Sequence, residues 1–151
     1  MKKYELTSET KIVFGHILYR IKALSSFGCV SAGDLGGFLE SEKNLSQNGN
    51  AWVFGNAEVY GDARVSGDAE VSKIGSIFWI GAVGSRNDTA TFFRCTDGVI
   101  RVTCGCFFGN LDEFAKKVRK THGDNDHAKV YMLAIDMAKI RISTEKEKTE
   151  E

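Results

Sequence analysis

Residues suited to binding phosphate and nucleobases gather behind a repetitive stretch of this sequence, in the segment "GSRNDT". The guanidinium of Arg86 offers a planar fork of donors that suits phosphate, and the amide of Asn87 can bind a base or ribose edge. Arg101 and Thr103 alternate on one face of an expected strand, near phenylalanines that could stack on a base. These types predict a pocket for a small anionic, nucleotide-like ligand, lined by Arg86, Asn87, Asp88, Thr89, Phe92, Arg101 and Thr103.

A structural interpretation of the same residues stays open at this point. Arg86 and Asp88 could form an ion pair that closes the end of the repeat, and the phenylalanines of "TFFRC" could belong to a hydrophobic core. The two interpretations predict different exposure, because a ligand site needs accessible arginines and a structural cap needs paired ones.

The segment "HGDNDH", residues 122–127, holds two histidines and two aspartates, and such a cluster could bind a metal ion. The same segment also fits a junction between two helices, with Gly123 as the C-cap of the first and Asp124 as the N-cap of the second. The junction accounts for these residues without a ligand. We therefore expect no metal site at His122 and His127, and no cofactor.

The four cysteines are not spaced like the disulfide framework of a small secreted protein. Cys104 and Cys106 form a C-x-C pair, which would need two further ligands to hold zinc. Reduced, buried thiols are the simpler expectation. Neither a membrane-spanning apolar run nor the apolar core of a signal peptide is present in the sequence. These features predict a cytoplasmic protein.

Twenty basic residues balance twenty acidic ones in the 151-residue chain, so the net charge is zero. A binder of duplex nucleic acid usually has a strong basic excess, and its absence disfavours that class. Hydrophobic residues make up 42% of the chain, which suffices for a core. The partners we expect are therefore a small ligand and further copies of this chain.

A six-residue repeat occupies the middle of the chain. In "GNAWVFGNAEVYGDARVSGDAEVS", residues 49–72, glycine, alanine and valine each recur every six residues, and the rhythm extends over about 39–84. A fixed period of this kind marks units that stack on their neighbours. We expect triangular coils of short parallel strands, with valine inside and glycine at the turns. Trp52, Phe54 and Tyr60 would then point outward, where another subunit could cover them.

Strands and helices are expected on both sides of the repeat. Two short strands should flank Gly15, and a hairpin turn at "TDG", residues 96–98, should join two more. Asn110 followed by Glu113 forms a capping box that predicts a helix ending at Gly123. A second helix should run from about 125 to 142. The apolar face expected for it consists of Val130, Leu133, Ala134, Met137 and Ala138.

The chain should therefore contain three parts. N-terminal strands and the repeat occupy residues 1–84, and an α+β region for ligand binding or assembly occupies residues 85–142. The charged segment "STEKEKTEE", residues 143–151, is expected to be disordered.

The hexad "NAWVFGNAEVYGDARVSGDAEVS" resembles the left-handed β-helix of hexapeptide-repeat proteins, which include acyltransferases. The stretch from "KKYELTSET" to "NGNAWV" resembles the start of small polymer-forming or transferase-like proteins, many encoded by bacteriophages and prophages. The resemblance implies a mainly β fold: a short left-handed parallel β-helix, followed by a β-hairpin and two helices. It also implies a homo-oligomer built on a trimer. Phages carry such proteins to remove nucleotide signals of bacterial defence.

In hexapeptide-repeat acyltransferases a histidine in or beside the coils acts as the base. The histidines of this chain, His16, His122 and His127, all lie outside the repeat. We therefore expect no enzymatic activity. The predicted function is an oligomeric binding protein that sequesters a small anionic, nucleotide-like signal. A structural or protein-interaction module and a hexapeptide-repeat acyltransferase are the alternatives.

Overall fold

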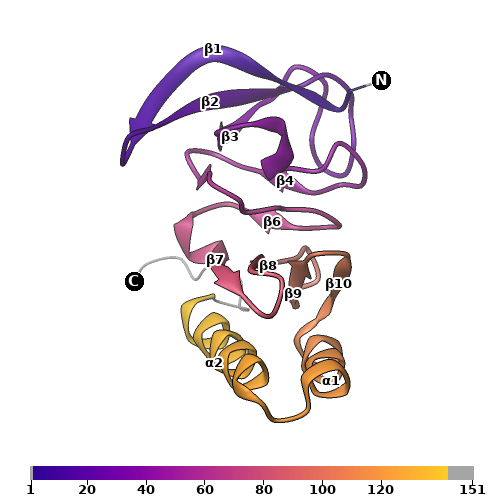
Figure 1. The fold of residues 1–151 in the computed structure, drawn as a ribbon. Helices are drawn as coiled ribbons and strands as arrows, with labels where there is room; N and C mark the ends of the chain where they lie inside the picture. The colour runs from indigo at the N-terminus through magenta and orange to yellow at the C-terminus, as the bar shows by residue number, and fades with distance from the viewer. Residues whose placement is uncertain (1, 143–151) are drawn as a thin grey trace, which may run out of the picture. The chain divides into compact units, whose positions relative to one another are not determined.

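The computed structural model describes residues 2–142, and the chain divides into two compact units, Met1–Ile74 and Gly75–Glu151 (Figure 1). The boundary expected from the repeat lay ten residues later, after Gly84, because Ile77 and Val83 continue the hexad rhythm in the sequence. The segment 143–151, for which we expected disorder, lies outside the described residues.

A long antiparallel hairpin begins the N-terminal unit. It consists of strands β1 (Tyr4–Val13) and β2 (His16–Ala23). Phe14 and Gly15 connect them, both at positive φ (49° and 84°), as a two-residue hairpin turn requires. The predicted pair of strands around Gly15 is confirmed, but the strands are not short, since β1 begins at Tyr4.

The repeat does not form a left-handed parallel β-helix, so that prediction is wrong. Strand β2 pairs antiparallel with β3 (Leu35–Leu39), which pairs parallel with β5 (Glu58–Val59), giving a mixed sheet of order β1-β2-β3-β5. Strands β4 (Trp52–Val53) and β6 (Glu70–Val71) form a separate two-stranded parallel sheet. Each hexad strand has only two residues, whereas β2 offers a long edge that pairs with β3 antiparallel.

The burial predicted for the valines and alanines of the hexads, and the turn position predicted for their glycines, are confirmed. All four hexad valines are at most 1% exposed, the hexad alanines are buried, and the hexad glycines have positive φ values between 59° and 75°. Two parallel contacts stack apolar side chains in this unit, Leu39 beside Val59 and Leu45 beside Val65. The repeat therefore builds a narrow apolar interior between one mixed sheet and one small parallel sheet.

Trp52 lies inside the N-terminal unit, which corrects its expected outward position. The side chain is 1% exposed, and its ring meets Tyr4 and Phe27 edge to face, with centroids 6.2 and 5.3 Å apart. These aromatic partners come from β1 and from the loop that follows β2. The face that the repeat leaves open is thus closed by the same chain.

The C-terminal unit begins with a four-stranded antiparallel sheet of order β10-β9-β8-β7. Its strands are β7 (Ile77–Val83), β8 (Asp88–Arg94), β9 (Ile100–Cys104) and β10 (Phe107–Asn110). The predicted hairpin between β8 and β9 is confirmed. The hexad rhythm expected up to residue 84 ends earlier in the structure, because β7 pairs antiparallel with β8 as a seven-residue strand.

Two helices follow the sheet: α1 (Leu111–His122) and α2 (Asp126–Arg141). The predicted capping box of α1 is confirmed, since the Asn110 and Glu113 side chains each accept a 2.8 Å hydrogen bond from the other's backbone N–H. Asn125, and not Asp124, caps α2 by accepting a 3.0 Å bond from the Ala128 N–H. Among the described residues, neither helix is long and apolar enough to cross a membrane.

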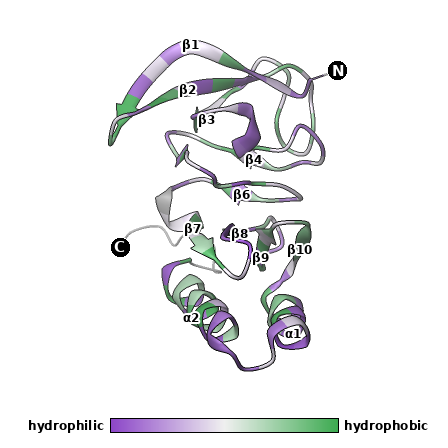
Figure 2. Ribbon diagram, viewed as in Figure 1, coloured by the Kyte–Doolittle hydropathy of each residue, from purple (hydrophilic) through white to green (hydrophobic). Residues whose placement is uncertain are grey.

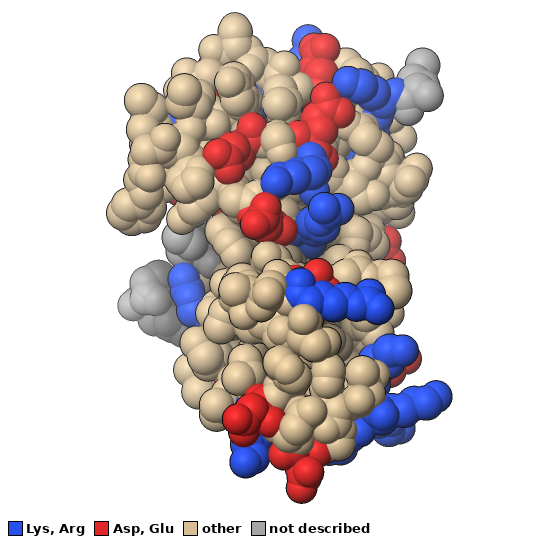
Figure 3. Space-filling model, in the orientation of Figure 1, with Lys and Arg blue, Asp and Glu red and all other residues tan. Residues whose placement is uncertain are grey.

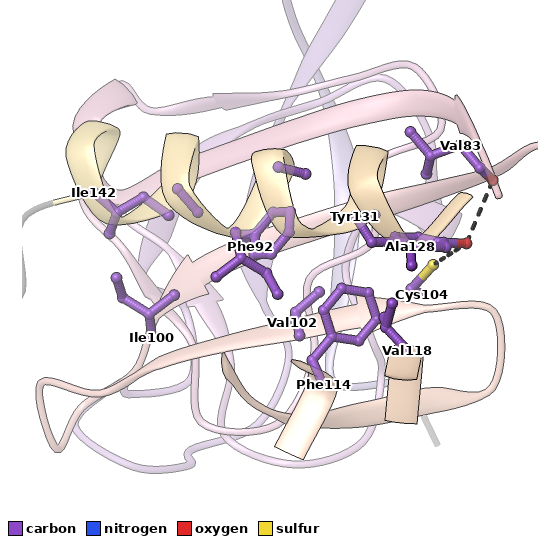
Figure 4. Packing of buried hydrophobic residues seen from close by; sticks show 14 residues of the cluster. Val83, Phe92, Ile100, Val102, Cys104, Phe114, Val118, Ala128, Tyr131 and Ile142 are labelled. Carbon is purple, nitrogen blue, oxygen red and sulfur yellow. Dashed lines mark hydrogen bonds between the residues drawn. The ribbon is translucent and has the colours of Figure 1, made fainter. Parts of the chain in front are cut away.

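The helices cover one face of this sheet, and aromatic rings fill the space between the layers (Figure 4). The apolar face predicted for α2 proves to be divided between two sides of the helix. Ala134 and Ala138 lie in the core, whereas Val130, Leu133 and Met137 are exposed. The residues of α2 buried against the sheet and α1 include Tyr131 and Ile135, which the predicted face omitted.

Candidate functional site

The turn between β7 and β8, residues 84–87, carries the first part of the predicted site. Gly84 and Asn87 both have positive φ, and the Asn87 N–H donates to the Gly84 carbonyl at 3.3 Å. Arg86 and Asn87 are exposed. Among the described residues, Arg86 makes no hydrogen bond or ion pair, so the structural pairing with Asp88 is not formed. The turn presents an uncompensated guanidinium to solvent.

Tyr131 of α2 supports this turn from behind. Its hydroxyl donates to the Val83 carbonyl at 3.5 Å and lies 4.0 Å from the Cys104 sulfur (Figure 4). Gly84 leaves the space for this hydroxyl, because a Cβ at that position would overlap it. The tyrosine ring stacks on His122, with centroids 5.8 Å apart. Tyr131 thus holds the start of the turn against α2, and it is itself in contact with Cys104 of β9 and His122 of α1.

The side chains of Cys104 and Tyr131, which lie beside the start of the turn, are both uncharged. Burial raises the pKa of the Cys104 thiol, and burial followed by the Cys104 sulfur and Asp88 raises the pKa of Tyr131 to about 12. Both groups are therefore protonated at neutral pH. A buried thiol of raised pKa is a poor nucleophile, so this cysteine is suited to packing and not to covalent chemistry.

Asp88 and Thr89 begin β8 directly after the turn and are half-buried. The Asp88 carboxylate points toward Gly105 of the neighbouring hairpin, where a Cβ would lie 3.1 Å from its Oδ2. Thr89 lies beside Gly81 of β7. These two residues directly follow Arg86 and Asn87 in the chain.

The histidines of "HGDNDH" lie at the junction of α1 and α2. The rings of His122 and His127 have centroids 5.3 Å apart, and Gly123 ends α1 with φ 66° and an N–H bond to Arg119. No three His, Cys, Asp or Glu side chains within residues 2–142 are placed to hold a metal ion. His122 stacks on Tyr131, so this junction is in contact with the tyrosine that supports the 84–87 turn.

Arg101 lies at the other end of the sheet. It pairs with Phe93 of β8, five residues from Asp88, which is about 17 Å along a strand. Its two guanidinium nitrogens bond the two carboxylate oxygens of Asp97 at 3.0 Å each. This bidentate bond is the main cause that lowers the pKa of Asp97. Arg101 is thus a paired residue that does not share a pocket with Arg86.

The prediction that Phe92 contacts a ligand is wrong. The side chain is 0% exposed and its ring lies in the core, with centroids 5.9 Å from Phe78 and 6.1 Å from Phe114. A strand alternates its side chains between two faces, and the helices cover the face that carries Phe92. Thr103 is half-buried in β9, opposite Thr91, between the two ends of the sheet.

Two surface grooves lie near the Arg101 end of the C-terminal unit. One of about 410 Å³ is lined by Val99, Ile100 and Asn110, among others, and one of about 240 Å³ runs between α1 and α2. Leu111 and Lys139 line both grooves, and neither groove includes a residue of the 84–87 turn. They arise where the two helices meet, so no local sequence signal indicates them.

A second polar cluster lies in the N-terminal unit and was missed from the sequence. His16 Nδ1 lies 2.8 Å from Glu40 Oε2, and the other oxygen of Glu40 accepts the Gly61 N–H at 2.8 Å. Both bonds lower the pKa of Glu40, and the bond to His16 is the larger cause. The imidazole also meets the Tyr60 ring, with centroids 5.0 Å apart. The cluster connects the β1–β2 hairpin to the repeat. His16 is far from Glu40 and Gly61 in the sequence, and only the fold brings these residues together.

Comparisons of this chain with protein-family models and with curated proteins gave no match.

Proposed function

We propose that the protein binds a small anionic, nucleotide-like ligand at the 84–87 turn and the first two residues of β8, and holds it without converting it. The observation that carries this proposal is the exposed guanidinium of Arg86, which has no ionic partner among residues 2–142 and stands on a turn fixed by the backbone and by Tyr131. A backbone turn that is already formed needs no ordering when a ligand binds, so it favours affinity.

The neighbouring groups suit the same class of ligand. The amide of Asn87 can donate to and accept from a base or ribose edge, and the hydroxyl of Thr89 can donate to a phosphate oxygen. The basic and acidic side chains are interspersed over the visible face of the protein (Figure 3). A ligand with one or two phosphates is therefore favoured over a long polyanion, which would need an extended basic surface.

Holding a ligand without turnover agrees with the groups behind the turn, because Cys104 and Tyr131 are neutral at physiological pH. Sequestration of a nucleotide signal in the cytoplasm of an infected bacterium, as the resemblance to phage proteins suggests, requires only stoichiometric binding. A protein-interaction module is the second candidate, favoured by the exposed apolar residues Ile12, Phe14 and Ile17 around the β1–β2 hairpin tip.

Isothermal titration calorimetry with inorganic phosphate, AMP and a cyclic dinucleotide tests the proposal. Replacing Arg86 by alanine should weaken binding roughly ten- to hundred-fold, since a charge-assisted contact contributes about 1.5–3 kcal/mol. Arg101→Ala is the matched control, because Asp97 already occupies that guanidinium. It should leave the affinity unchanged. Absence of binding to every probe, or equal affinity of the Arg86→Ala variant, would contradict the proposal.

A further inference from the structure

Helix α2 is apolar on two separate sides. One side lies in the core of the C-terminal unit, and the other is exposed to solvent although it carries four large apolar side chains. Their exposed fractions are 41% for Val130, 63% for Leu133, 46% for Met137 and 87% for Ile140. We call these four residues the outer stripe. The hydropathy of α2 is shown in Figure 2.

The spacing of the outer stripe is that of a helix pair. Its members follow one another by three, four and three residues, which is the a and d spacing of two heptads. A helix that is apolar on opposite sides is normally covered on both, and large contiguous apolar surfaces mark interaction sites. The stripe therefore fits a second helix lying along α2.

We propose that the outer stripe is the seam of a parallel homodimer, in which α2 of one copy lies beside α2 of a second copy. In this arrangement each stripe residue meets its own counterpart, so Leu133 packs on Leu133 and Met137 on Met137. The seam is formed by residues of the same kind in both copies, as a two-fold interface requires.

The charges beside the stripe favour a second copy as the partner and a parallel orientation. Asp136 and Arg141 flank the stripe on opposite sides, at g and e positions, and both are exposed. Neither forms an ion pair within residues 2–142. In a parallel pair the g residue of one helix lies near the e residue five positions later on the other. Asp136 of each copy then faces Arg141 of the other, and an antiparallel pair would bring the two Asp136 carboxylates together.

The dimer does not depend on the proposed ligand. The stripe faces away from the residues of α2 that support the 84–87 turn, and none of its members contributes to that turn. Four side chains from each copy make a small interface, so we expect a weak dimer whose population depends on protein concentration.

Sedimentation equilibrium of the full chain over a range of micromolar concentrations tests this dimer. The wild type should follow a monomer–dimer equilibrium, and Leu133→Glu should remain monomeric with an unchanged helical circular dichroism spectrum. Asp136→Arg should weaken dimerisation at least ten-fold, and the exchanged pair Asp136→Arg with Arg141→Asp should restore it. Asp124→Arg, an exposed charge outside α2, is the matched control and should have no effect.

Orientation has its own measurement. In a protein whose exposed Cys29 and Cys106 are replaced by serine, Leu133→Cys should form a disulfide-linked dimer on mild oxidation. An antiparallel pair would not bring these two residues together. A monomer at all concentrations, a dimer insensitive to Leu133→Glu, or an exchanged pair that fails to restore association would each overturn the proposal.

Discussion

The two units of this protein bury apolar surface by different means. In the N-terminal unit, valines from short strands fill a narrow interior, and neighbouring backbones come close enough that Gly36 and Gly37 have no room for a Cβ. In the C-terminal unit, rings such as Phe92 and Phe114 lie between a sheet and two helices. The first arrangement closes on itself, whereas the second leaves the outer side of α2 uncovered.

The largest expected loss of stability comes from placing a charge in the narrow interior of the N-terminal unit. Val65→Asp should lower the free energy of unfolding by more than about 4 kcal/mol, because a carboxylate there has no partner and loses its hydration. Urea unfolding of the variant checks this value. Asp68→Asn, at an exposed position of the same repeat, is the control and should change stability by less than about 0.5 kcal/mol.

The units should respond to alkaline pH in opposite directions. Burial lowers the pKa of Lys3 from 10.5 to about 8, so the unfolded chain binds more protons between these values. The N-terminal unit should therefore gain about 2–3 kcal/mol as the pH rises from 8 to about 10. Above pH 10 the ionisation of Tyr4 in the unfolded chain opposes this gain, because burial raises the pKa of Tyr4 in the folded unit. Burial raises the pKa of Cys104 and Tyr131 above 9.0 and 10.0, so the unfolded chain ionises first. The C-terminal unit should therefore lose stability as pH rises above about 9.

Two probes separate these responses. In a Trp79→Phe variant, the fluorescence of Trp52 reports only the N-terminal unit, and circular dichroism at helical wavelengths reports α1 and α2 of the C-terminal unit. Urea midpoints at pH 8 and pH 10 should then move apart. Lys3→Met should abolish the rise in stability of the N-terminal unit between pH 8 and pH 10. A rise that persists in this variant would show that Lys3 is not its cause.

Glycine substitutions give the smallest expected effect. A Cβ at Gly37 would lie 2.5 Å from the Ala57 carbonyl oxygen, a backbone atom that cannot move freely, so Gly37→Ala should cost about 1–3 kcal/mol. Gly84→Ala in the C-terminal unit should cost a comparable amount, because a φ of 77° strains any L side chain and the Cβ would overlap the Tyr131 hydroxyl. Thermal unfolding of both variants measures the two losses, and an unchanged melting temperature of either variant would contradict the close approach at that glycine.

Much of the local structure was predictable from the sequence, because its causes are local. The Gly15 hairpin, the β8–β9 hairpin and the Asn110 capping box each depend on a few adjacent residues. The β-helix prediction failed because strand pairing is decided by distant segments. Strand β2 pairs with β3 and turns the parallel stack into a mixed sheet.

The candidate site was predictable only in part. The residue types of "GSRNDT" predict Arg86 as a phosphate donor, and the turn does present it to solvent. The burial of Phe92 and the pairing of Arg101 with Asp97 depend on which face the helices cover and on how the hairpin closes. Tyr131 supports the turn from a distant position in the chain, and no spacing in the sequence indicates that contact.

The inward position of the hexad valines follows from the sequence alone. A six-residue period places each valine equivalently, and glycine alone adopts positive φ at each turn without strain. What covers the remaining surface depends on the tertiary fold. Trp52 and Leu133 are both large apolar residues. Tyr4 and Phe27 cover Trp52, whereas nothing within the described residues covers Leu133. Burial of such a residue depends on where distant segments fold, and periodicity carries no information about that.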